Sequence, residues 1–146
     1  MATTPVIYVL NGPNLNLLGT REPEIYGHDT LASIEEQVKS QGARLGFHIE
    51  FRQSNHEGVL IDWLQEAGRE GAHAVLLNAG GYTHTSIAIH DAIKAIMLPV
   101  FEVHLSDPEK REDFRHLSYV GKAARACFAG HGAKSYELAL DAAAAL

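Results

Sequence analysis

Short apolar runs alternate with amphipathic segments along the chain, and this alternation constrains the fold more than any other feature of the sequence. Residues 6–10 have the length and the β-branched content of a buried strand. Residues 47–52 alternate apolar and polar side chains, which is typical of a half-buried strand near a sheet edge. The other expected strands are residues 74–77, 99–104 and 126–129.

Apolar residues recur at helical spacing between these strands. The expected helices begin near Asp29 or Thr30, cover residues 60–67 and 86–96, and run from Ser135 to the end of the chain. Strands that alternate with helices at this spacing indicate an α/β domain with a parallel sheet and helices on both faces. Five strands fit the doubly wound, flavodoxin-like order 2-1-3-4-5. The sequence shows no linker and no repeat, so we expect a single domain over residues 1–146.

Composition narrows the range of partners. The formal net charge is −6 and no basic run is present, which argues against nucleic acid or an anionic membrane as a partner. Cys127 is the only cysteine, so an intrachain disulfide is excluded, as suits a reducing compartment. The N-terminus does not resemble a signal peptide, and no apolar stretch approaches the roughly 20 residues that span a bilayer. We therefore expect a soluble cytoplasmic protein.

The segment 11–27 is the longest one without a strand or helix pattern. Its two prolines, three glycines and three asparagines predict irregular structure. Long loops in compact domains are usually lids or binding loops, and this one carries Arg21 and Tyr26. The ring of a loop tyrosine ordinarily packs against apolar residues, and a pKa near 10 makes its hydroxyl a poor base. A guanidinium within about 4–6 Å favours the phenolate, so closure of the loop over a ligand could turn Tyr26 into a base.

Parallel sheets of this kind bind ligands beyond the carboxyl ends of their strands, where the strand order reverses. In the expected order this point lies between the first and third strands. Three polar segments follow neighbouring strands: 11–27, 78–85 and 104–106. The topology therefore predicts one crevice with all three segments around it.

Two histidines near this crevice could carry chemistry. His104 ends a central strand, and Glu102 points to the same face two residues earlier. A carboxylate beside an imidazole fixes the tautomer of the ring and favours its protonated form, which suits a proton donor. His84 lies in a glycine-rich loop at the same rim, where a functional and a surface role are both open. His90, within a helix, is interpreted as an ordinary surface residue.

An anion could bind where a short helix is expected after Asp107 and Pro108, because free N–H groups at a helix start attract a carboxylate. Arg115 could add a charge-assisted hydrogen bond there, or it could be a solvated arginine in a charged segment. The GxxxxGK[ST] and GxGxxG patterns are absent, so nucleotide binding is weakly supported. A metal could be assembled from His84, His104 and either Asp91 or Glu102, but no HExxH or Cys/His spacing supports it.

Five ordered motifs give the chain a specific resemblance. They are NGPNLNLLGTREPEIYG at 11–27, SNHEG at 54–58, NAGGYTHTS at 78–86, EVHLS at 102–106 and REDFRHLSY at 111–119. Together they resemble the type II 3-dehydroquinate dehydratases over essentially the whole chain. Asp107 departs from the asparagine that is frequent there, but both residues can cap a helix. The residues after Ala133 carry no motif.

The resemblance implies loss of water from 3-dehydroquinate to give 3-dehydroshikimate, by anti elimination through an enolate. This lyase reaction needs neither a cofactor, a metal nor a Schiff base, and it would serve either the shikimate pathway, which leads to aromatic amino acids, or quinate breakdown. The resemblance also implies a role for each site residue. Tyr26 is the base, Arg21 supports its phenolate, and Asn14 stabilises the enolate through a water. His104, oriented by Glu102, is the acid. The substrate carboxylate is held by Asn78, Leu105 and Ser106, and the substrate hydroxyls are contacted by His84 and Arg115.

The resemblance also implies assembly. Asp91 would reach a site across a subunit interface, and Arg115 could act from a similar position. Similar proteins form trimers that pack into dodecamers. The competing interpretation is a non-catalytic flavodoxin-like module that binds a flavin or a phosphorylated ligand, which would need a phosphate loop after the first strand.

Overall fold

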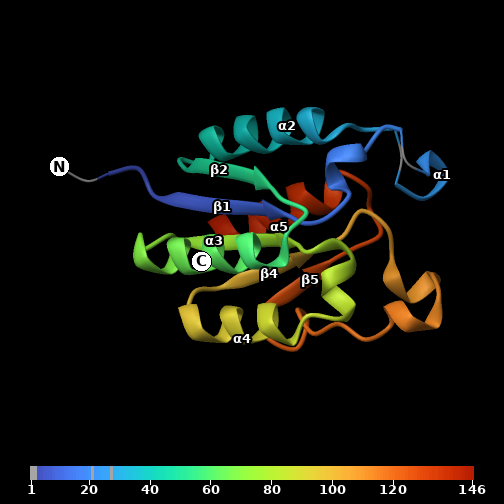
Figure 1. The fold of residues 1–146 in the computed structure, drawn as a ribbon. Helices are drawn as coiled ribbons and strands as arrows, with labels where there is room; N and C mark the ends of the chain where they lie inside the picture. The colour runs from blue at the N-terminus through green and yellow to red at the C-terminus, as the bar shows by residue number, and fades with distance from the viewer. Residues whose placement is uncertain (1–2, 21, 27) are drawn as a thin grey trace.

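The structure is a computed structural model that describes residues 3–20, 22–26 and 28–146, without the side chains of Pro23 and Tyr26. Five parallel strands form one sheet in the order β2-β1-β3-β4-β5, which confirms the predicted flavodoxin-like topology (Figure 1). The strands are β1 (Val6–Asn11), β2 (His48–Gln53), β3 (Ala74–Asn78), β4 (Val100–Val103) and β5 (Ala126–Phe128). All five residues of β3 are buried, whereas β2 lies at the edge as predicted.

Four helices of ten or more residues cover the two faces of the sheet (Figure 1). They are α2 (Leu31–Arg44), α3 (Glu57–Arg69), α4 (Ile87–Ile96) and α5 (Lys134–Ala144). α2 begins where the sequence predicts, because Thr30 and Ser33 cap it reciprocally through side chain and backbone. Ser86 caps α4 by accepting a hydrogen bond from the N–H of Ile89.

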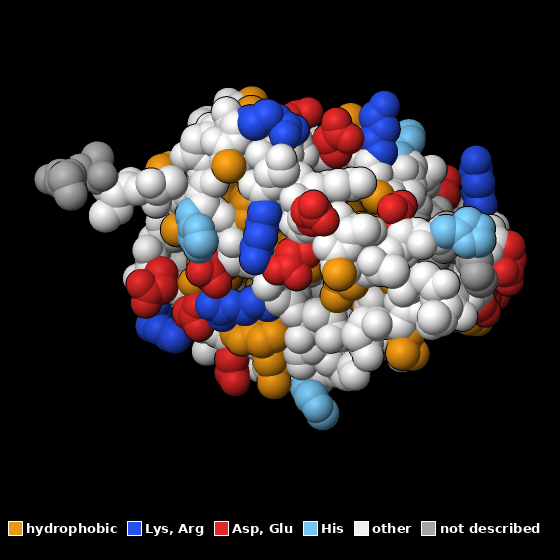
Figure 2. Space-filling view, turned by 90° about the horizontal axis from the view of Figure 1, so that it is seen from above, with side chains coloured by type: hydrophobic (Ala, Val, Ile, Leu, Met, Phe, Trp, Pro, Cys, Tyr) orange, Lys and Arg blue, Asp and Glu red, His pale blue; other side chains and the backbone are white. Residues whose placement is uncertain are grey.

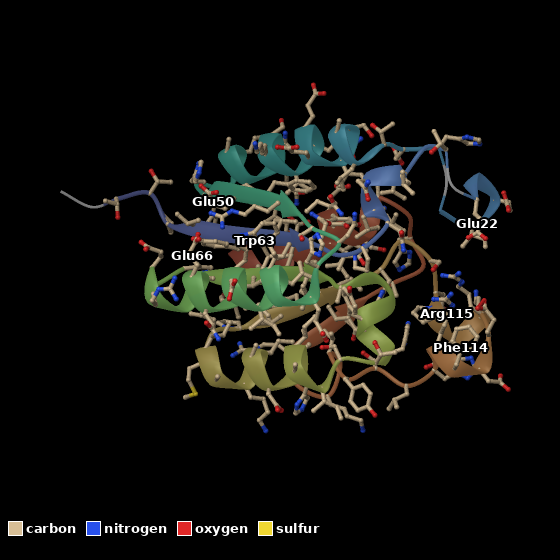
Figure 3. The ribbon with its side chains drawn as sticks, in the orientation of Figure 1. Glu22, Glu50, Trp63, Glu66, Phe114 and Arg115 are labelled. Carbon is tan, nitrogen blue, oxygen red and sulfur yellow. The ribbon has the colours of Figure 1, made fainter. Side chains whose placement is uncertain are left out.

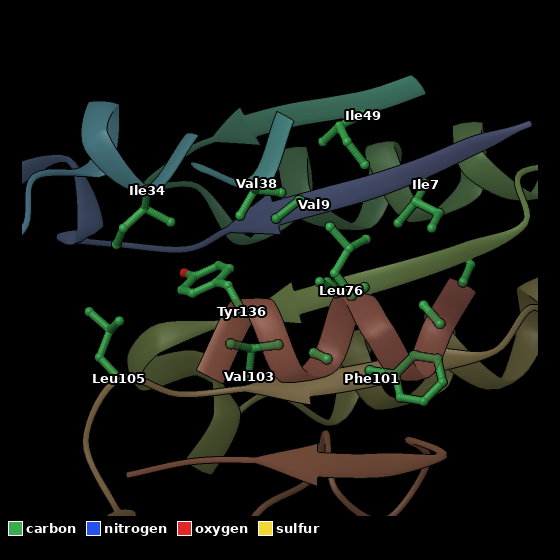
Figure 4. Close-up of a cluster of buried hydrophobic side chains, with 14 of the residues drawn as sticks. Ile7, Val9, Ile34, Val38, Ile49, Leu76, Phe101, Val103, Leu105 and Tyr136 are labelled. Carbon is green, nitrogen blue, oxygen red and sulfur yellow. The ribbon is translucent and has the colours of Figure 1, made fainter. Parts of the chain in front are cut away.

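The alternation of side chains along the strands divides the core into two layers. Ile7 and Val9 of β1 face α2 and α5, and Ile34 and Tyr136 are among the helix residues that pack there (Figure 4). The opposite layer places residues of β1 and β3 against α3 and α4. Its largest members are Tyr8, Leu10, Val75, Leu77, Leu60, Leu64, Ile89 and Ile93. The sheet is therefore buried on both faces, and a ligand has access only at its ends and edges.

One polar network lies inside the first layer, at the carboxyl ends of the central strands. The hydroxyl of Tyr136 donates to Asn11 Oδ1 at 2.6 Å and accepts from Asn78 Nδ2 at 2.9 Å. Asn11 Nδ2 in turn donates to the carbonyl of Arg52 at 2.9 Å. Burial raises the pKa of Tyr136 well above its ordinary value, so the phenol stays protonated. The network ties α5 to the ends of β1, β2 and β3.

A charged cluster covers the exposed side of the edge strand (Figure 3). Arg52 Nη2 lies 2.7 Å from Glu66 Oε2 and 3.3 Å from Glu50 Oε2, and its guanidinium packs over the rings of Tyr8 and Trp63. Tyr8 donates to Glu66 at 2.7 Å, and burial together with that carboxylate raises the pKa of Tyr8 to about 12. On the face seen in Figure 2, basic and acidic side chains are interspersed.

The prediction of irregular structure over 11–27 holds only in part, because two short helices lie within it. A 3-10 helix spans Leu15–Leu17 and a short α1 spans Pro23–Tyr26. Leu15 and Leu18 are buried in the first core layer, because leucines three residues apart share one side of a turn. Gly12 fits closely against the next loop, since a Cβ there would lie 2.5 Å from the carbonyl oxygen of Ala79. This part of the loop is thus packed onto the domain.

α2 ends at Arg44, and the next residue, Leu45, is exposed. α3 begins at Glu57, directly after a short turn. The short helix after Asp107 is a 3-10 helix, Pro108–Lys110, capped by Asp107 as predicted, and a second one spans Asp113–Arg115. None of the helices in the described part of the chain is long and apolar enough to cross a membrane.

We predict that Tyr136→Phe lowers the free energy of unfolding by about 1–3 kcal/mol, because it leaves buried Asn11 and Asn78 groups without their hydrogen-bond partner. Urea denaturation followed by circular dichroism measures this. Tyr82→Phe is the matched control, since the Tyr82 hydroxyl donates to the carbonyl of Asn55 near the surface and its loss should cost less. Equal losses for the two variants would contradict the assignment of a structural role to the buried network.

Candidate active site

A pocket lies at the carboxyl ends of β1, β3 and β4, where the topology predicts it. All three predicted polar segments contribute to its wall. The lining residues are Pro13, Asn14, Leu15, Asn78, Gly80, Gly81, His84, His104, Leu105, Ser106, Pro108, Arg111 and Arg115. None of these described lining residues is acidic, whereas two are arginines. The pocket is therefore a basic site within a chain of net charge −6, and it suits an anionic ligand.

A buried ion-pair partner lies behind the pocket wall. His104 follows β4, and its Nε2 lies 2.6 Å from Oε2 of Glu102, with both residues buried. The contact predicted from their spacing is confirmed. Because the ionised carboxylate accepts from Nε2–H, the second ring nitrogen, Nδ1, is left as the atom that can exchange a proton with a ligand.

Glu102 stays ionised although it is buried. Burial alone would raise the pKa of its carboxyl, but hydrogen bonds from His104, Ser118 and Cys127 outweigh that effect and lower the pKa. The Ser118 hydroxyl donates to Oε2 at 2.7 Å and itself accepts from the N–H of Gly121 at 2.8 Å. A side chain at Gly121 would come within 2.8 Å of Oε1 of Glu102, so the chain passes closely over the carboxylate. The carboxylate is thus fixed in one orientation.

His84 has a different environment. Its Nδ1 lies 2.7 Å from the carbonyl oxygen of Leu117, which can only accept, so Nδ1 carries the hydrogen. Burial lowers the pKa of His84, and the nearby charges of His104 and Arg115 lower it further, while the Leu117 carbonyl opposes this. His84 is therefore neutral near pH 7, with Nε2 free to accept a hydrogen bond. Its ring stacks on that of His104 at a centroid distance of 6.4 Å.

One segment, residues 117–121, positions both histidines. Leu117 fixes the tautomer of His84, and Ser118 holds the carboxylate that orients His104. The N–H of Tyr119 donates to the carbonyl of Thr83 at 2.8 Å, which attaches the segment to the loop of His84. Sequence reasoning assigned no role to Ser118, because nothing in the local pattern shows that it folds back onto a residue 16 positions earlier.

The two arginines come from the 3-10 segments after β4. Arg111 Nη1 lies 3.3 Å from the hydroxyl of Ser106, and Arg115 Nε donates to Glu112 at 3.0 Å. Arg115 and Phe114 lie at the same end of the molecule as Glu22, which precedes α1 (Figure 3). Arg111 was missed as a pocket residue, because the sequence reads there as a charged, solvated run. Arg111 ends one 3-10 helix in an extended conformation and Arg115 lies in the next, so the sequence carries no periodic signal that pairs them.

Two asparagines complete the wall. Asn14 has a left-handed backbone, with φ of 70°, and its N–H donates to Asn55 Oδ1 at 3.0 Å. Gln53 Nε2 donates to the carbonyl of Gly12 at 3.1 Å, so β2 and the turn after it hold the base of the first loop. Asn78 gives one amide hydrogen to Tyr136 at 2.9 Å, and its Oδ1 accepts from the N–H of Gly80 at 3.3 Å.

The structure brings most of the predicted site residues together. Those that line the pocket are Asn14, Asn78, His84, His104, Leu105, Ser106 and Arg115, with Glu102 directly behind His104. Asp91 does not line it: its side chain, on α4, is 69% exposed and contacts His90 at 2.9 Å. Arg21 lies outside the described residues. Only the backbone of Tyr26, in α1, is described, so the roles of both remain predictions.

Among the described residues, the group that could hold a metal differs from the one considered in the sequence. Ligand atoms of Glu102, His104 and Cys127 all lie within 4.8 Å of one another. Neither His84 nor Asp91 belongs to this group.

Comparison with known proteins places the chain in a family. Residues 5–144 match the family described as dehydroquinase class II. The chain belongs to that family. A 3-dehydroquinate dehydratase of Variovorax paradoxus is 59% identical over 140 residues, which are 93% of this chain and 96% of that protein. One of Phenylobacterium zucineum is 61% identical over 140 residues, which are 96% of each.

Solved structures agree with this assignment. The type II dehydroquinase from Propionibacterium acnes superposes with a TM-score of 0.94 at 38% identity and covers 100% of both chains. That from Butyrivibrio crossotus also gives 0.94 at 38% identity and covers 97% of this chain and 99% of that chain. The family resemblance stated from the motifs is confirmed. Class II dehydroquinases are enzymes, so the competing interpretation, a non-catalytic binding module, is wrong for this chain.

We predict that Ser118→Ala lowers kcat by about 10-fold and leaves KM nearly unchanged, because a hydrogen bond to a charged group contributes about 1.5–3 kcal/mol. Loss of this donor favours the neutral carboxyl and raises the pKa of Glu102. The loss of activity on the acidic side should therefore begin at a higher pH than in the wild type. Ser118→Thr keeps the hydroxyl and serves as the control. Identical pH profiles for wild type and Ser118→Ala would contradict this role.

Proposed function

We propose that this protein dehydrates 3-dehydroquinate to 3-dehydroshikimate by anti elimination through an enolate. The observation that carries the proposal is the buried Glu102–His104 pair, which adjoins a pocket with two arginines in its wall. Relatives that carry the name 3-dehydroquinate dehydratase match nearly the whole chain. A carboxylate substrate fits the basic wall, and a leaving hydroxyl needs the proton that an imidazolium can give.

The reaction divides between a base and an acid. Tyr26, as the phenolate, takes the proton from C2 of the substrate, and Arg21 stabilises that phenolate. The electron pair moves into the carbonyl, and Asn14 stabilises the resulting enolate oxygen through a bound water. When the enolate collapses, His104 gives the proton at Nδ1 to the departing hydroxyl, which leaves as water. Glu102 holds Nε2 throughout and stabilises the imidazolium, as its position at 2.6 Å supports.

Asn78 and the segment of Leu105 and Ser106 bind the substrate carboxylate. The carbonyls of Leu105 and Ser106 accept from the backbone N–H groups of Gly132 and Gly130 at 3.0 and 3.1 Å. In a trans peptide the N–H points away from the C=O. The N–H of Ser106 therefore points away from Gly132, where it is available to a carboxylate.

His84 and Arg115 bind the hydroxyls of the substrate. A neutral His84 accepts through Nε2, as its bond to Leu117 supports, and the guanidinium of Arg115 donates. Asp91, with a side chain 69% exposed on α4, completes the site of a neighbouring subunit in a dodecamer of four trimers.

We infer a cytoplasmic location, as the single cysteine suggests. The reaction serves either the shikimate pathway or quinate breakdown.

His104→Ala should lower kcat by at least about 100-fold with little change in substrate binding, because general acid catalysis contributes about 10²–10⁴-fold. The assay follows the absorbance of the conjugated enone that forms from dehydroquinate, and calorimetry follows binding. His48→Ala, which removes a histidine on β2 whose side chain is 59% exposed, is the control for the loss of an imidazole. Near-normal turnover by His104→Ala would refute the assignment of the acid.

Tyr26→Phe should abolish turnover while substrate still binds, because it keeps the ring and removes the ionisable oxygen. Arg21→Ala should instead move the limb of the pH–rate profile that reports the base to higher pH, since the phenolate loses its cation. Arg21→Lys should restore activity only in part, because an ammonium lacks the planar fork of a guanidinium. If the limb stays in place while the rate falls uniformly, Arg21 positions the substrate and does not tune the base.

A further inference from the structure

A second cavity adjoins the substrate pocket and shares His84, His104, Pro108 and Arg115 with it. Its lining includes Glu102, His104 and Cys127, with the carboxylates of Asp107 and Glu109 near them. Cys127 is on β5, the short edge strand, and is exposed. Neither Asn14 nor Asn78 lines this cavity, and the exposed Cys127 opens it to solutes in the solvent.

Three potential metal ligands of different types meet at this cavity. One oxygen of Glu102, one ring nitrogen of His104 and Sγ of Cys127 all lie within 4.8 Å of one another. Atoms bound to one Zn²⁺ at about 2.0–2.3 Å lie roughly 4 Å or less apart, so shifts below about 1 Å bring these three into one coordination sphere. We propose that Glu102, His104 and Cys127 form an inhibitory site for a thiophilic divalent cation, with Zn²⁺ as its type.

The charges of such a complex balance. Burial and the negative charge of Glu102 raise the pKa of the Cys127 thiol to about 12, so without a cation the thiol keeps its proton and donates to the carboxylate. When Zn²⁺ binds, the thiol proton leaves to solvent and a Zn–S bond forms. The hydrogen on Nε2 of His104 is released while Nδ1 takes one up, so the ring stays neutral. One thiolate and one carboxylate then neutralise the two charges of the ion.

The set of ligands selects the cation. Thiolate and imidazole favour Zn²⁺ and Cd²⁺ over the hard cations Mg²⁺ and Ca²⁺, which take oxygen ligands. Three protein ligands leave a fourth position for water from the cavity, as in open zinc sites. Asp107 and Glu109 near the site increase the local concentration of cations. Arg115 also lines the cavity, and its positive charge repels cations. A cation at this site is therefore held by its bond to the thiolate and not by electrostatic attraction alone.

Binding at this site disables the acid, and it leaves in place Asn78, Leu105 and Ser106, which are proposed to hold the substrate carboxylate. The ion binds the carboxylate of Glu102, which orients His104. It also binds the His104 nitrogen that donates to this carboxylate. The imidazolium, which the acid step needs, can no longer form, since a ring nitrogen bound to a metal cannot also carry a proton. Zn²⁺ should therefore lower kcat much more than it changes KM.

The test uses the full-length protein with two probes. ZnCl₂ is titrated against the rate, each variant being compared with its own metal-free rate, and CdCl₂ is titrated against the ultraviolet thiolate-to-cadmium absorption band. Cys127 is the only cysteine, so this band reports this site alone. We expect a band in the wild type and reversal of inhibition by a chelator.

Cys127→Ala should raise the half-inhibiting concentration of Zn²⁺ by at least about 100-fold, since loss of even an outer-shell partner costs 10–100-fold in affinity. His104→Ala and Glu102→Gln should weaken the cadmium band in the same titration. His48→Ala, which removes an exposed histidine beside Glu50, is the control and should change neither readout. A wild type without a cadmium band, or a Cys127→Ala variant that stays as sensitive to Zn²⁺, would overturn the proposal. The cadmium titration needs no catalysis, so it remains decisive even if the proposed reaction is wrong.

Discussion

An ionised carboxylate buried at the end of β4 is the constraint on which the rest of the site depends. Transfer of a lone charge from water into a protein interior is costly, so Glu102 can stay ionised only while donors surround it. The structure supplies them from three separate parts of the chain: His104 two residues on, Ser118 from the returning segment and Cys127 from the edge strand. The positions of these elements are therefore coupled to one charge, and the chemistry of His104 is coupled to the packing of all three.

The same arrangement separates the two histidines by function although their rings stack. His104 faces a carboxylate, and His84 faces a carbonyl, which accepts a hydrogen bond but carries no charge. One ring thus contacts a buried anion, and burial lowers the pKa of the other. This difference in environment is consistent with the roles proposed for them, a proton donor and a group that binds a hydroxyl.

The sequence predicted the sheet order and the location of the pocket because both follow from periodicity and from the rules of parallel sheets. It also predicted the Glu102–His104 contact, since residues two apart on a strand share a face. Ser118, Arg111 and the Asn11–Tyr136–Asn78 network could not be predicted in this way. Each depends on a contact between distant segments, or on a helical turn too short to give a periodic signal. The order within 11–27 was missed because Leu15 and Leu18 are too few to show a period, although they are buried.

The charged cluster on β2 has a consequence for the behaviour of the protein in a crowded solution. An open sheet exposes two edges, each with backbone groups that can pair with another chain. On one edge, His48, Glu50 and Arg52 stand on the same side of β2, and Arg52 is fixed between Glu50 and Glu66. A foreign strand that docked there would have to strip water from these charges. The opposite edge, β5, has only three residues. The sheet is thereby protected from amyloid-like growth at both ends while its central strands stay rich in the β-branched and apolar residues that such growth requires.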